Sequence, residues 1–228
     1  MAQKLNPYII LDFETGGVKG GKENAITEVA MLCVDGGTFM EVGRYESYVQ
    51  PYIGYEYEDK ALEYTGITMD LLRAEGKPLL QVGNEMCELI KKWHSETSNT
   101  HTKKPVVVGH NVQFDISFLQ QVMRESKNDI SKYFDGKLDF HGKYYPNYID
   151  TMRLAMLAFS NDENFTSFKL GNCIEKVGLA LTDAHKAIND VIATKEMLIK
   201  FVNRLRNETG KEGRESNIRL RQNYVFPL

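Results

Sequence analysis

The sequence predicts an α/β domain in which a mixed sheet is flanked by helices. Three observations lead to this prediction: an apolar run near the N-terminus, a second apolar run at residues 105–109 that leads into helical periodicity, and several helical segments in the C-terminal half. Strands first, then helix, strand and further helices is an order typical of layered α/β domains. A chain of 228 residues can bury a substantial core without disulfides or a structural metal.

The N-terminal strands are predicted from short apolar segments. Residues 8–11 are four apolar residues, two of them β-branched, directly before an acidic turn, which is typical of a buried central strand. Residues 26–34 and 39–49 read as two further strands. The intervening Asp35-Gly36-Gly37 predicts a tight hairpin in which Asp-Gly supplies the residue with positive φ.

The middle of the chain predicts helices around a second buried strand. Residues 60–64 and 80–94 have the apolar spacing of half-buried helices, and a polar loop follows at 95–104. Residues 105–109 form a continuous apolar run, as in a strand buried on both faces, and residues 114–124 resume helical periodicity.

The C-terminal half is expected to be mostly helical. Residues 128–148 show no clear period and predict a surface loop or insertion. Three helical segments follow, at residues 151–159, 169–177 and 185–205. We expect residues 1–206 to form one domain and residues 207–228 to form a polar C-terminal extension.

Composition excludes several classes of protein. A net charge of −3 excludes a broad basic surface, so any nucleic-acid contact must be local. Cys33, Cys87 and Cys173 lie far apart without a C-x-x-C pair, which favours buried, reduced thiols in a reducing compartment. The first apolar run is too short for a signal sequence or a membrane span. We therefore expect a cytoplasmic protein without membrane association.

Two carboxylates directly follow the first predicted strand. Asp12 and Glu14 are two residues apart, so in extended backbone they project to one face while Phe13 points into the core. Oxygen-rich ligand sets of this kind suit Mg²⁺ or Mn²⁺. Thr15 and Gly16 then offer a hydroxyl and an open backbone N–H to a phosphate or a sugar.

Two later segments add further candidates, each with a simpler alternative. Asp115 follows the second buried strand, but it also fits the first turns of a helix with Asn111 as N-cap. His185 and Asp190 are five residues apart, about 500° along a helix, so they do not share one helical face. For both to reach one site, His185 must lie in the loop or first turn and Asp190 farther along; a solvated histidine and a surface aspartate are the alternative.

A phosphate-binding loop is a competing interpretation of the segment after Glu14. Residues 16–22 match most of the pattern G-x-x-x-x-G-K-[ST], but Glu23 replaces the hydroxyl that would bind Mg²⁺. The next segment predicts a strand, whereas the motif requires a helix. A flexible turn explains this segment better.

Taken in order, the motifs Asp-x-Glu-Thr-Gly, Asn-x-x-Phe-Asp and His-x-x-x-x-Asp resemble the DEDDh branch of the DnaQ-like 3′-to-5′ exonucleases. The resemblance covers roughly residues 8–203. It implies an RNase H-like fold and a metal-dependent 3′-to-5′ exonuclease that releases nucleoside 5′-monophosphates.

The resemblance also implies roles for individual residues. Two divalent cations, Mg²⁺ or Mn²⁺, would be held by Asp12, Glu14, Asp115 and Asp190, with Asp12 as the bridging ligand. His185 would take the proton from the attacking water. The candidates for contact with the terminal nucleotide are Phe13, Thr15, Gly16, His110, Asn111 and Phe114.

Single-stranded DNA is the expected substrate, in proofreading or repair. The alternatives are an exoribonuclease that acts on RNA 3′ ends and a non-catalytic nucleic-acid-binding module on the same fold. Residues 222–228 loosely resemble peptides that dock on a sliding clamp, so a clamp or a DNA polymerase is a candidate partner for the C-terminal extension. A terminal strand would look the same.

Overall fold

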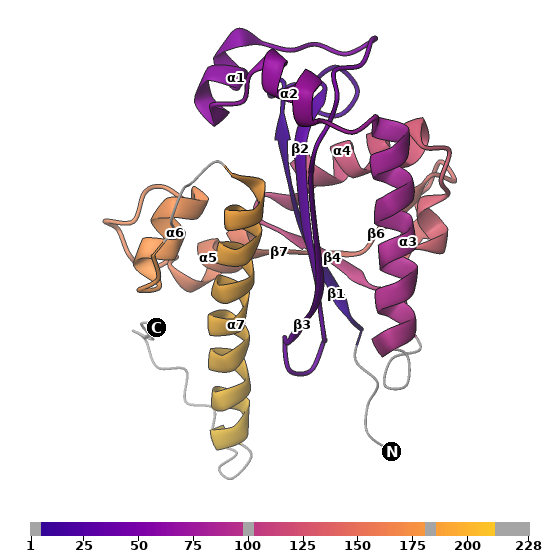
Figure 1. Ribbon diagram of the computed structural model, residues 1–228. Helices are drawn as coiled ribbons and strands as arrows, with labels where there is room; N and C mark the ends of the chain where they lie inside the picture. The colour runs from indigo at the N-terminus through magenta and orange to yellow at the C-terminus, as the bar shows by residue number, and fades with distance from the viewer. Residues whose placement is uncertain (1–5, 98–102, 181–185, 213–228) are drawn as a thin grey trace.

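The chain folds around one five-stranded mixed sheet. The computed structural model describes residues 6–97, 103–180 and 186–212, with side chains up to residue 205. The sheet has the order β3-β2-β1-β4-β7 (Figure 1). Its strands are β1 (Tyr8–Thr15), β2 (Ile26–Val34), β3 (Glu41–Tyr48), β4 (Val106–Gly109) and β7 (Tyr148–Asp150).

Strand direction changes at the centre of the sheet. β2 pairs antiparallel with both β1 and β3, whereas β4 pairs parallel with both β1 and β7. All nine residues of β2 are buried, as its position inside the sheet requires. The predicted mixed α/β fold is confirmed, with the first predicted strand at its centre.

Helices cover both faces of the sheet. In Figure 1, α3 and α4 lie on one side and α7 on the other, with α5 and α6 beside α7. The helices are α1 (Asp59–Thr65), α2 (Met69–Glu75), α3 (Leu79–Thr97), α4 (Val112–Glu125), α5 (Thr151–Ala158), α6 (Leu170–Lys176) and α7 (Ala187–Glu212). Within the described ranges, no helix combines the length and apolar character needed to cross a membrane.

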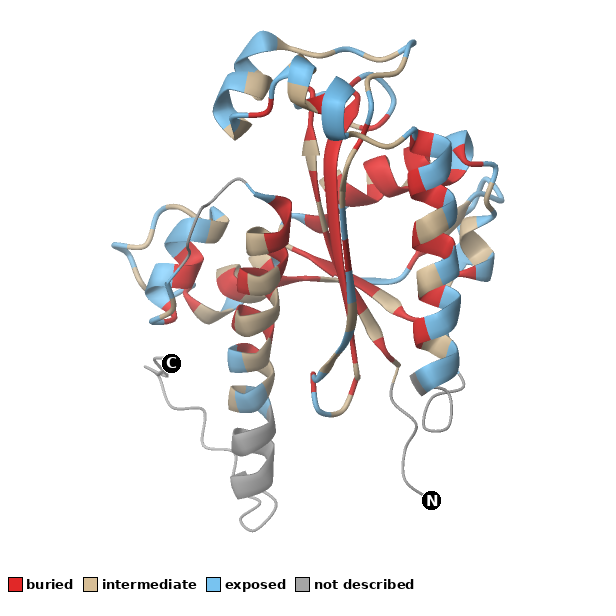
Figure 2. Cartoon of the chain, in the orientation of Figure 1, coloured by how far each residue is buried: buried red, intermediate tan, exposed pale blue. Residues whose placement is uncertain are grey.

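Residues of β1 alternate between two cores, and this alternation positions the site. Ile9 and Leu11 pack with apolar side chains of α3 and α4, whereas Ile10 packs with those of α7. Figure 2 shows the buried residues concentrated along the strands and on the helix sides that face them. Because side chains alternate along a strand, Asp12 and Glu14 lie on the α7 face.

Several elements differ from the sequence-based expectation. The positive φ of the hairpin between β2 and β3 belongs to Phe39 (59°) and not to a glycine. The turn is longer than a two-residue loop, and the Asp35 carboxylate closes it by accepting the N–H groups of Gly37 and Thr38. Asp35 thereby stabilises the turn without a left-handed glycine.

Several short elements were not predicted from the sequence. These are α2, the 3₁₀ turn η1 (Ile130–Lys132), β7, and a hairpin of β5 (Gly136–Leu138) and β6 (Tyr144–Pro146) within the segment expected to be a loop. All of these except α2 are three residues long, which is too short for a hydrophobic period to show. α7 runs to Glu212, past the expected boundary at residue 206, and the division into 1–206 and 207–228 stays a prediction.

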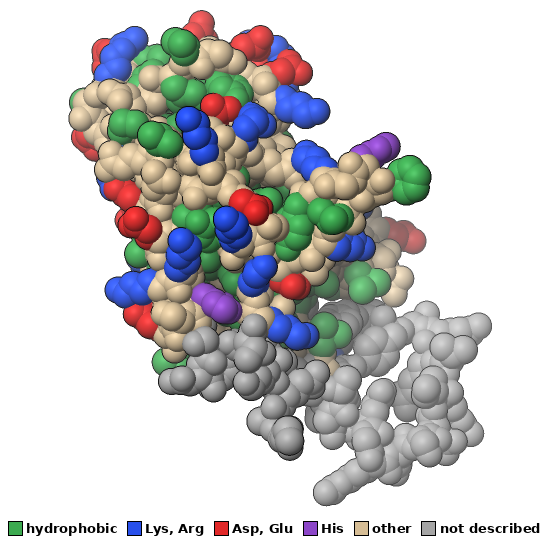
Figure 3. Space-filling model, turned by 90° about the vertical axis from the view of Figure 1, so that its right-hand side faces the viewer, with side chains coloured by type: hydrophobic (Ala, Val, Ile, Leu, Met, Phe, Trp, Pro, Cys, Tyr) green, Lys and Arg blue, Asp and Glu red, His purple; other side chains and the backbone are tan. Residues whose placement is uncertain are grey.

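The cysteines and the surface charge agree with the composition. Cys33, Cys87 and Cys173 are buried and free. On the face that carries α3 and the β5–β6 hairpin, Lys and Arg side chains are interspersed with Asp and Glu (Figure 3). This face has no uniform field that would bind a duplex along its whole length.

Gly43 is required by the packing of α3 on β3. An ideal Cβ at this position would lie 2.1 Å from Nε1 of Trp93, whose side chain is 3% exposed. We expect Gly43→Ala to lower the free energy of unfolding by about 1–3 kcal/mol, because the buried ring must move. Urea unfolding measures the change. Gly171→Ala in α6, where a Cβ meets nothing within 4 Å, is the control, and an equal effect of both substitutions would contradict this account.

Candidate metal centre and active site

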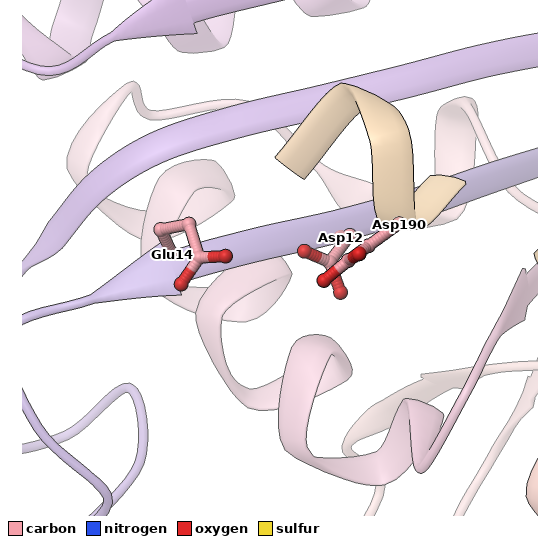
Figure 4. Close-up of side chains that lie close together, drawn as sticks. All are labelled: Asp12, Glu14 and Asp190. Carbon is pink, nitrogen blue, oxygen red and sulfur yellow. The ribbon is translucent and has the colours of Figure 1, made fainter. Parts of the chain in front are cut away.

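Three carboxylates meet where β1 passes the start of α7. Asp12, Glu14 and Asp190 each offer one oxygen, and these atoms all lie within 4.8 Å of one another (Figure 4). The two-residue spacing on β1 places Asp12 and Glu14 on one face. Asp190 comes from the first turn of α7. Three of the four predicted metal ligands are thus brought together.

Asp115 reaches the same strand from α4. It is 3% exposed, and its Oδ1 accepts the backbone N–H of Phe13 at 3.2 Å. β1 pairs with β4 only as far as Ile10 opposite Val108, so the N–H of Phe13 lies beyond the end of the paired region. α4 begins just after β4 and supplies the missing acceptor, which holds Asp115 beside the backbone between Asp12 and Glu14.

The carboxyl groups strongly perturb one another. Burial, then the charges of Asp190 and Glu28, raise the pKa of Asp12 to about 8. Burial, then the charge of Asp12, raise the pKa of Glu14 to about 9. Burial, with the charge of Asp12, also raises the pKa of Asp115 well above its ordinary value. A divalent cation would relieve both the repulsion and the loss of hydration, so these oxygen donors fit Mg²⁺ or Mn²⁺.

Glu28 is an acidic neighbour that the sequence analysis missed. It lies on β2 directly opposite Glu14 and is 3% exposed. The available signal was a single carboxylate within an otherwise largely apolar predicted strand. Buried acidic side chains are rare unless they have a partner or a role.

The predicted aromatic contacts pack inside the protein. Phe13 is 4% exposed and belongs to the core under α3 and α4, on the face opposite the carboxylates. Phe114 is half-buried and packs edge-on against Phe118, with ring centroids 5.0 Å apart. The structure therefore does not bring the Phe13 ring to the acidic cluster.

Thr15 and Gly16 are bonded within the protein. The Thr15 hydroxyl donates to the carbonyl of Gly17 at 2.7 Å. Gly16 donates its N–H to the Ala25 carbonyl at 2.8 Å and accepts the N–H of Glu58 at 2.7 Å. The expectation of an open N–H at Gly16 is corrected: this loop is bonded to Ala25, directly before β2, and to Glu58, directly before α1. Turns and a strand follow it, not the helix that a phosphate-binding loop requires.

His110 and Asn111 connect β4 to α4 along the chain and form hydrogen bonds with the start of α5. The His110 ring nitrogens lie 3.0 Å from Thr151 Oγ1 and 2.7 Å from the Phe168 carbonyl oxygen, and burial lowers the pKa of this histidine. Asn111 has a φ of 62°, makes no side-chain cap on α4, and donates its N–H to Asp150 Oδ1 at 3.0 Å. Contact of His110 or Asn111 with substrate stays a prediction.

His185 lies outside the described residues. Lys186, the first described residue after the gap at 181–185, stands directly before α7. The role of His185 as a base stays a prediction.

Carboxylates from a central strand and two helices, gathered on a mixed sheet, define a site suited to divalent cations. The chain belongs to the RNase_T family of exonucleases, whose model matches residues 9–198. The DEDDh exonuclease family inferred from the sequence is confirmed.

Known proteins of several kinds resemble this chain. A PolC-type DNA polymerase III from Oceanobacillus iheyensis is 25% identical over 96% of this chain, which spans 13% of the polymerase. Ribonuclease T from Hahella chejuensis is 27% identical, and the match covers 86% of this chain and 83% of the ribonuclease. The chain thus spans only a small part of the PolC-type relatives.

The fold is shared with a solved exonuclease. E. coli Exonuclease I in complex with a dT13 oligonucleotide superposes with a TM-score of 0.66 at 21% identity, over 91% of this chain and 44% of that chain. At this identity the likeness supports the RNase H-like fold.

Proposed function

We propose that this chain is a metal-dependent exonuclease that removes nucleoside 5′-monophosphates from the 3′ ends of single-stranded DNA. The observation that carries the proposal is the cluster of Asp12, Glu14 and Asp190, with oxygens within 4.8 Å of one another. Buried like charges destabilise a fold unless something compensates them. A cation bound with the substrate is the compensation that this donor set favours.

The four carboxylates have two proposed tasks, which are to bind metal and to fix the geometry of β1. Asp12, Glu14, Asp115 and Asp190 would hold two divalent cations, Mg²⁺ or Mn²⁺. When bound, such cations would supply charge stabilisation for the attacking and leaving oxygens of an in-line displacement. Asp115 fixes the geometry of β1 through the N–H of Phe13.

His185 acts as the general base for the attacking water. Its ordinary pKa suits proton transfer near neutral pH. We expect His185→Ala to lower kcat by roughly 10²- to 10⁴-fold, the usual contribution of a general base, with metal binding retained. Single-turnover cleavage measures the loss. His141→Ala, on the exposed β5–β6 hairpin, is the matched control, and near wild-type cleavage by His185→Ala would remove His185 from the mechanism.

RNA is the second candidate substrate, and a specific finding favours it. Ribonuclease T from Hahella chejuensis is a relative that this chain matches over most of the ribonuclease's length. DNA is favoured by the PolC-type relatives and by the oligonucleotide bound to Exonuclease I. A groove that tolerates 2′-hydroxyl groups would accept both polymers.

A DNA polymerase is the proposed partner, because the PolC-type relatives contain a matching segment. The candidate clamp-docking peptide at residues 222–228 lies outside the described residues and stays a prediction, as does a cytoplasmic location. A non-catalytic binding module is disfavoured, since it would have no need of three half-buried carboxylates so close together.

The decisive experiment compares two polymers. Single-stranded DNA and RNA of matched sequence, labelled at the 5′ end, are incubated with Mg²⁺ or Mn²⁺, and EDTA serves as a control. A ladder that shortens from the 3′ end establishes the activity, and the faster polymer identifies the preferred substrate. Metal-replete, folded protein that cleaves neither would instead favour the binding module.

A further inference from the structure

Glu28 lies beside the acidic cluster without belonging to it. It is the β2 residue directly opposite Glu14, and opposite residues of an antiparallel pair project to the same face. Its side chain is 3% exposed. The cluster whose oxygens lie within 4.8 Å of one another consists of Asp12, Glu14 and Asp190, so Glu28 has no assigned task there.

The contact of Glu28 is with the start of α7. Among the described residues, the hydrogen bond to its carboxylate comes from the backbone N–H of Ala187, at 3.4 Å to Oε2. Ala187 is the first residue of α7. The first N–H groups of a helix have no partner within the helix, and the helix dipole favours negative charge at that end. Glu28 therefore supplies, from a neighbouring strand, both an acceptor and a favourable charge.

The same helix turn carries a metal ligand. The Lys186 carbonyl accepts the N–H groups of Asn189 at 2.9 Å and Asp190 at 3.2 Å, so Asp190 lies within the first turn. Asp190 follows Ala187 by three residues, one helical turn or less. A shift at Ala187 would therefore move the Asp190 carboxylate relative to β1.

The position of Glu28 is unfavourable on other grounds. Burial raises its pKa, and the charges of Glu46 and Asp190 act in the same direction, whereas the Ala187 N–H and Lys186 oppose them. An apolar side chain would suit a buried position on β2 better. A carboxylate that remains there needs a role, and the bond to α7 provides one.

We propose that Glu28 is a positioning residue that anchors the N-terminus of α7 to β2 and so sets the distance from Asp190 to Asp12 and Glu14. The proposal rests on the proposed function, because it concerns the same metal centre. Outer residues that orient metal ligands typically change metal affinity or activity by about 10- to 100-fold when they are replaced.

The test compares two variants of Glu28 with a control variant of the nearby residue Glu46. Glu28→Ala removes the acceptor, whereas Glu28→Gln keeps an oxygen that accepts the Ala187 N–H. Glu46→Ala is the matched control, because Glu46 is an exposed carboxylate and lines one surface cavity together with Glu28. Mn²⁺ affinity is measured by calorimetry, and kcat and KM are measured on labelled single-stranded DNA; thermal unfolding checks that each variant is folded.

We expect Glu28→Ala to weaken Mn²⁺ binding and lower kcat by about 10- to 100-fold, with KM changed less than about threefold. Glu28→Gln should restore both to within about fivefold of wild type, and Glu46→Ala should change neither. Wild-type Mn²⁺ affinity in Glu28→Ala would overturn the proposal. Equal losses in both Glu28 variants would identify a direct metal ligand instead, and would also overturn it.

Metal binding separates this proposal from the proposed function. Wild-type protein that binds Mn²⁺ but cleaves no polymer would end the proposed exonuclease activity while leaving the Glu28 comparison valid. Wild-type protein that binds no Mn²⁺ would overturn both.

Discussion

Asp12→Asn is expected to lower kcat for exonucleolytic cleavage by roughly 10³-fold or more. Besides burial, the charge of Asp190 raises the pKa of Asp12, and the charge of Asp12 in turn raises the pKa values of Glu14 and Asp115. Asp12 therefore lies electrostatically at the centre of the site. Loss of a metal ligand would remove several kcal/mol of transition-state stabilisation, and each 1.36 kcal/mol is about tenfold in rate.

The same substitution separates catalysis from folding. Asparagine has nearly the size of aspartate but no charge, so the metal-free variant should unfold at a higher temperature than metal-free wild type. Activity and unfolding temperature thus move in opposite directions. Asp70→Asn, on an exposed side chain of α2 that pairs with Arg73, is the control and should leave cleavage unchanged.

If Asp12→Asn keeps more than about a tenth of wild-type kcat at saturating metal, Asp12 is not the central ligand. Cleavage by rapid quench, over a range of Mg²⁺ and Mn²⁺ concentrations, measures this. The metal series is needed because a weakened site can be refilled at high concentration.

The stability of the metal-free protein is expected to fall as pH rises from about 6 to 9. The pKa values of Asp12 and Glu14 are raised from 3.8 and 4.5 to about 8 and about 9. Between those values the folded protein holds protons that the unfolded chain has released. The folded state thus binds more protons, and stability is lost as pH rises through the folded pKa values.

A bound divalent metal should remove the dependence of stability on pH. A cation displaces the same protons, so the gap in unfolding temperature between the Mg²⁺-loaded and the metal-free protein should widen with pH. A gap on the order of 5 °C at pH 9 corresponds to about 1–3 kcal/mol for a chain of this size. Differential scanning calorimetry in EDTA and in Mg²⁺ measures it.

Asp12→Asn provides the internal check on this pH effect. This variant lacks one carboxyl group whose pKa is raised, so in EDTA its unfolding temperature should depend less steeply on pH. An unfolding temperature that rises with pH in metal-free wild type would contradict the assigned protonation of Asp12 and Glu14.

Local patterns were enough to predict the central strand and the pair of carboxylates on it. The four apolar residues before Asp12 predicted a short buried strand, and the two-residue spacing of Asp12 and Glu14 then predicted their common face. Asp115 and Asp190 were found because ordered motifs resemble an exonuclease family, since neither segment is distinctive alone. The helix starts around them follow from ordinary helical periodicity.

Contacts between distant segments were decided by the tertiary structure. Asp115 meets the N–H of Phe13 because β4 ends before β1 does, and strand pairing is not encoded in either segment alone. The N–H of Gly16 donates to the carbonyl of Ala25, which the local sequence did not predict. Such bonds depend on which backbone groups the sheet leaves unpaired, and every buried one must find a partner.

At Glu28, one property follows from the local sequence and another only from the tertiary structure. Its place in an apolar strand is visible in the sequence, but its partner, Ala187, is 159 residues away. Hydrophobic periodicity is a local property and therefore predicts strands, helices and the faces they bury. Register between strands and the docking of helix ends arise only when the whole core packs. They determine which carboxylates lie close together and which one accepts a hydrogen bond from a helix end.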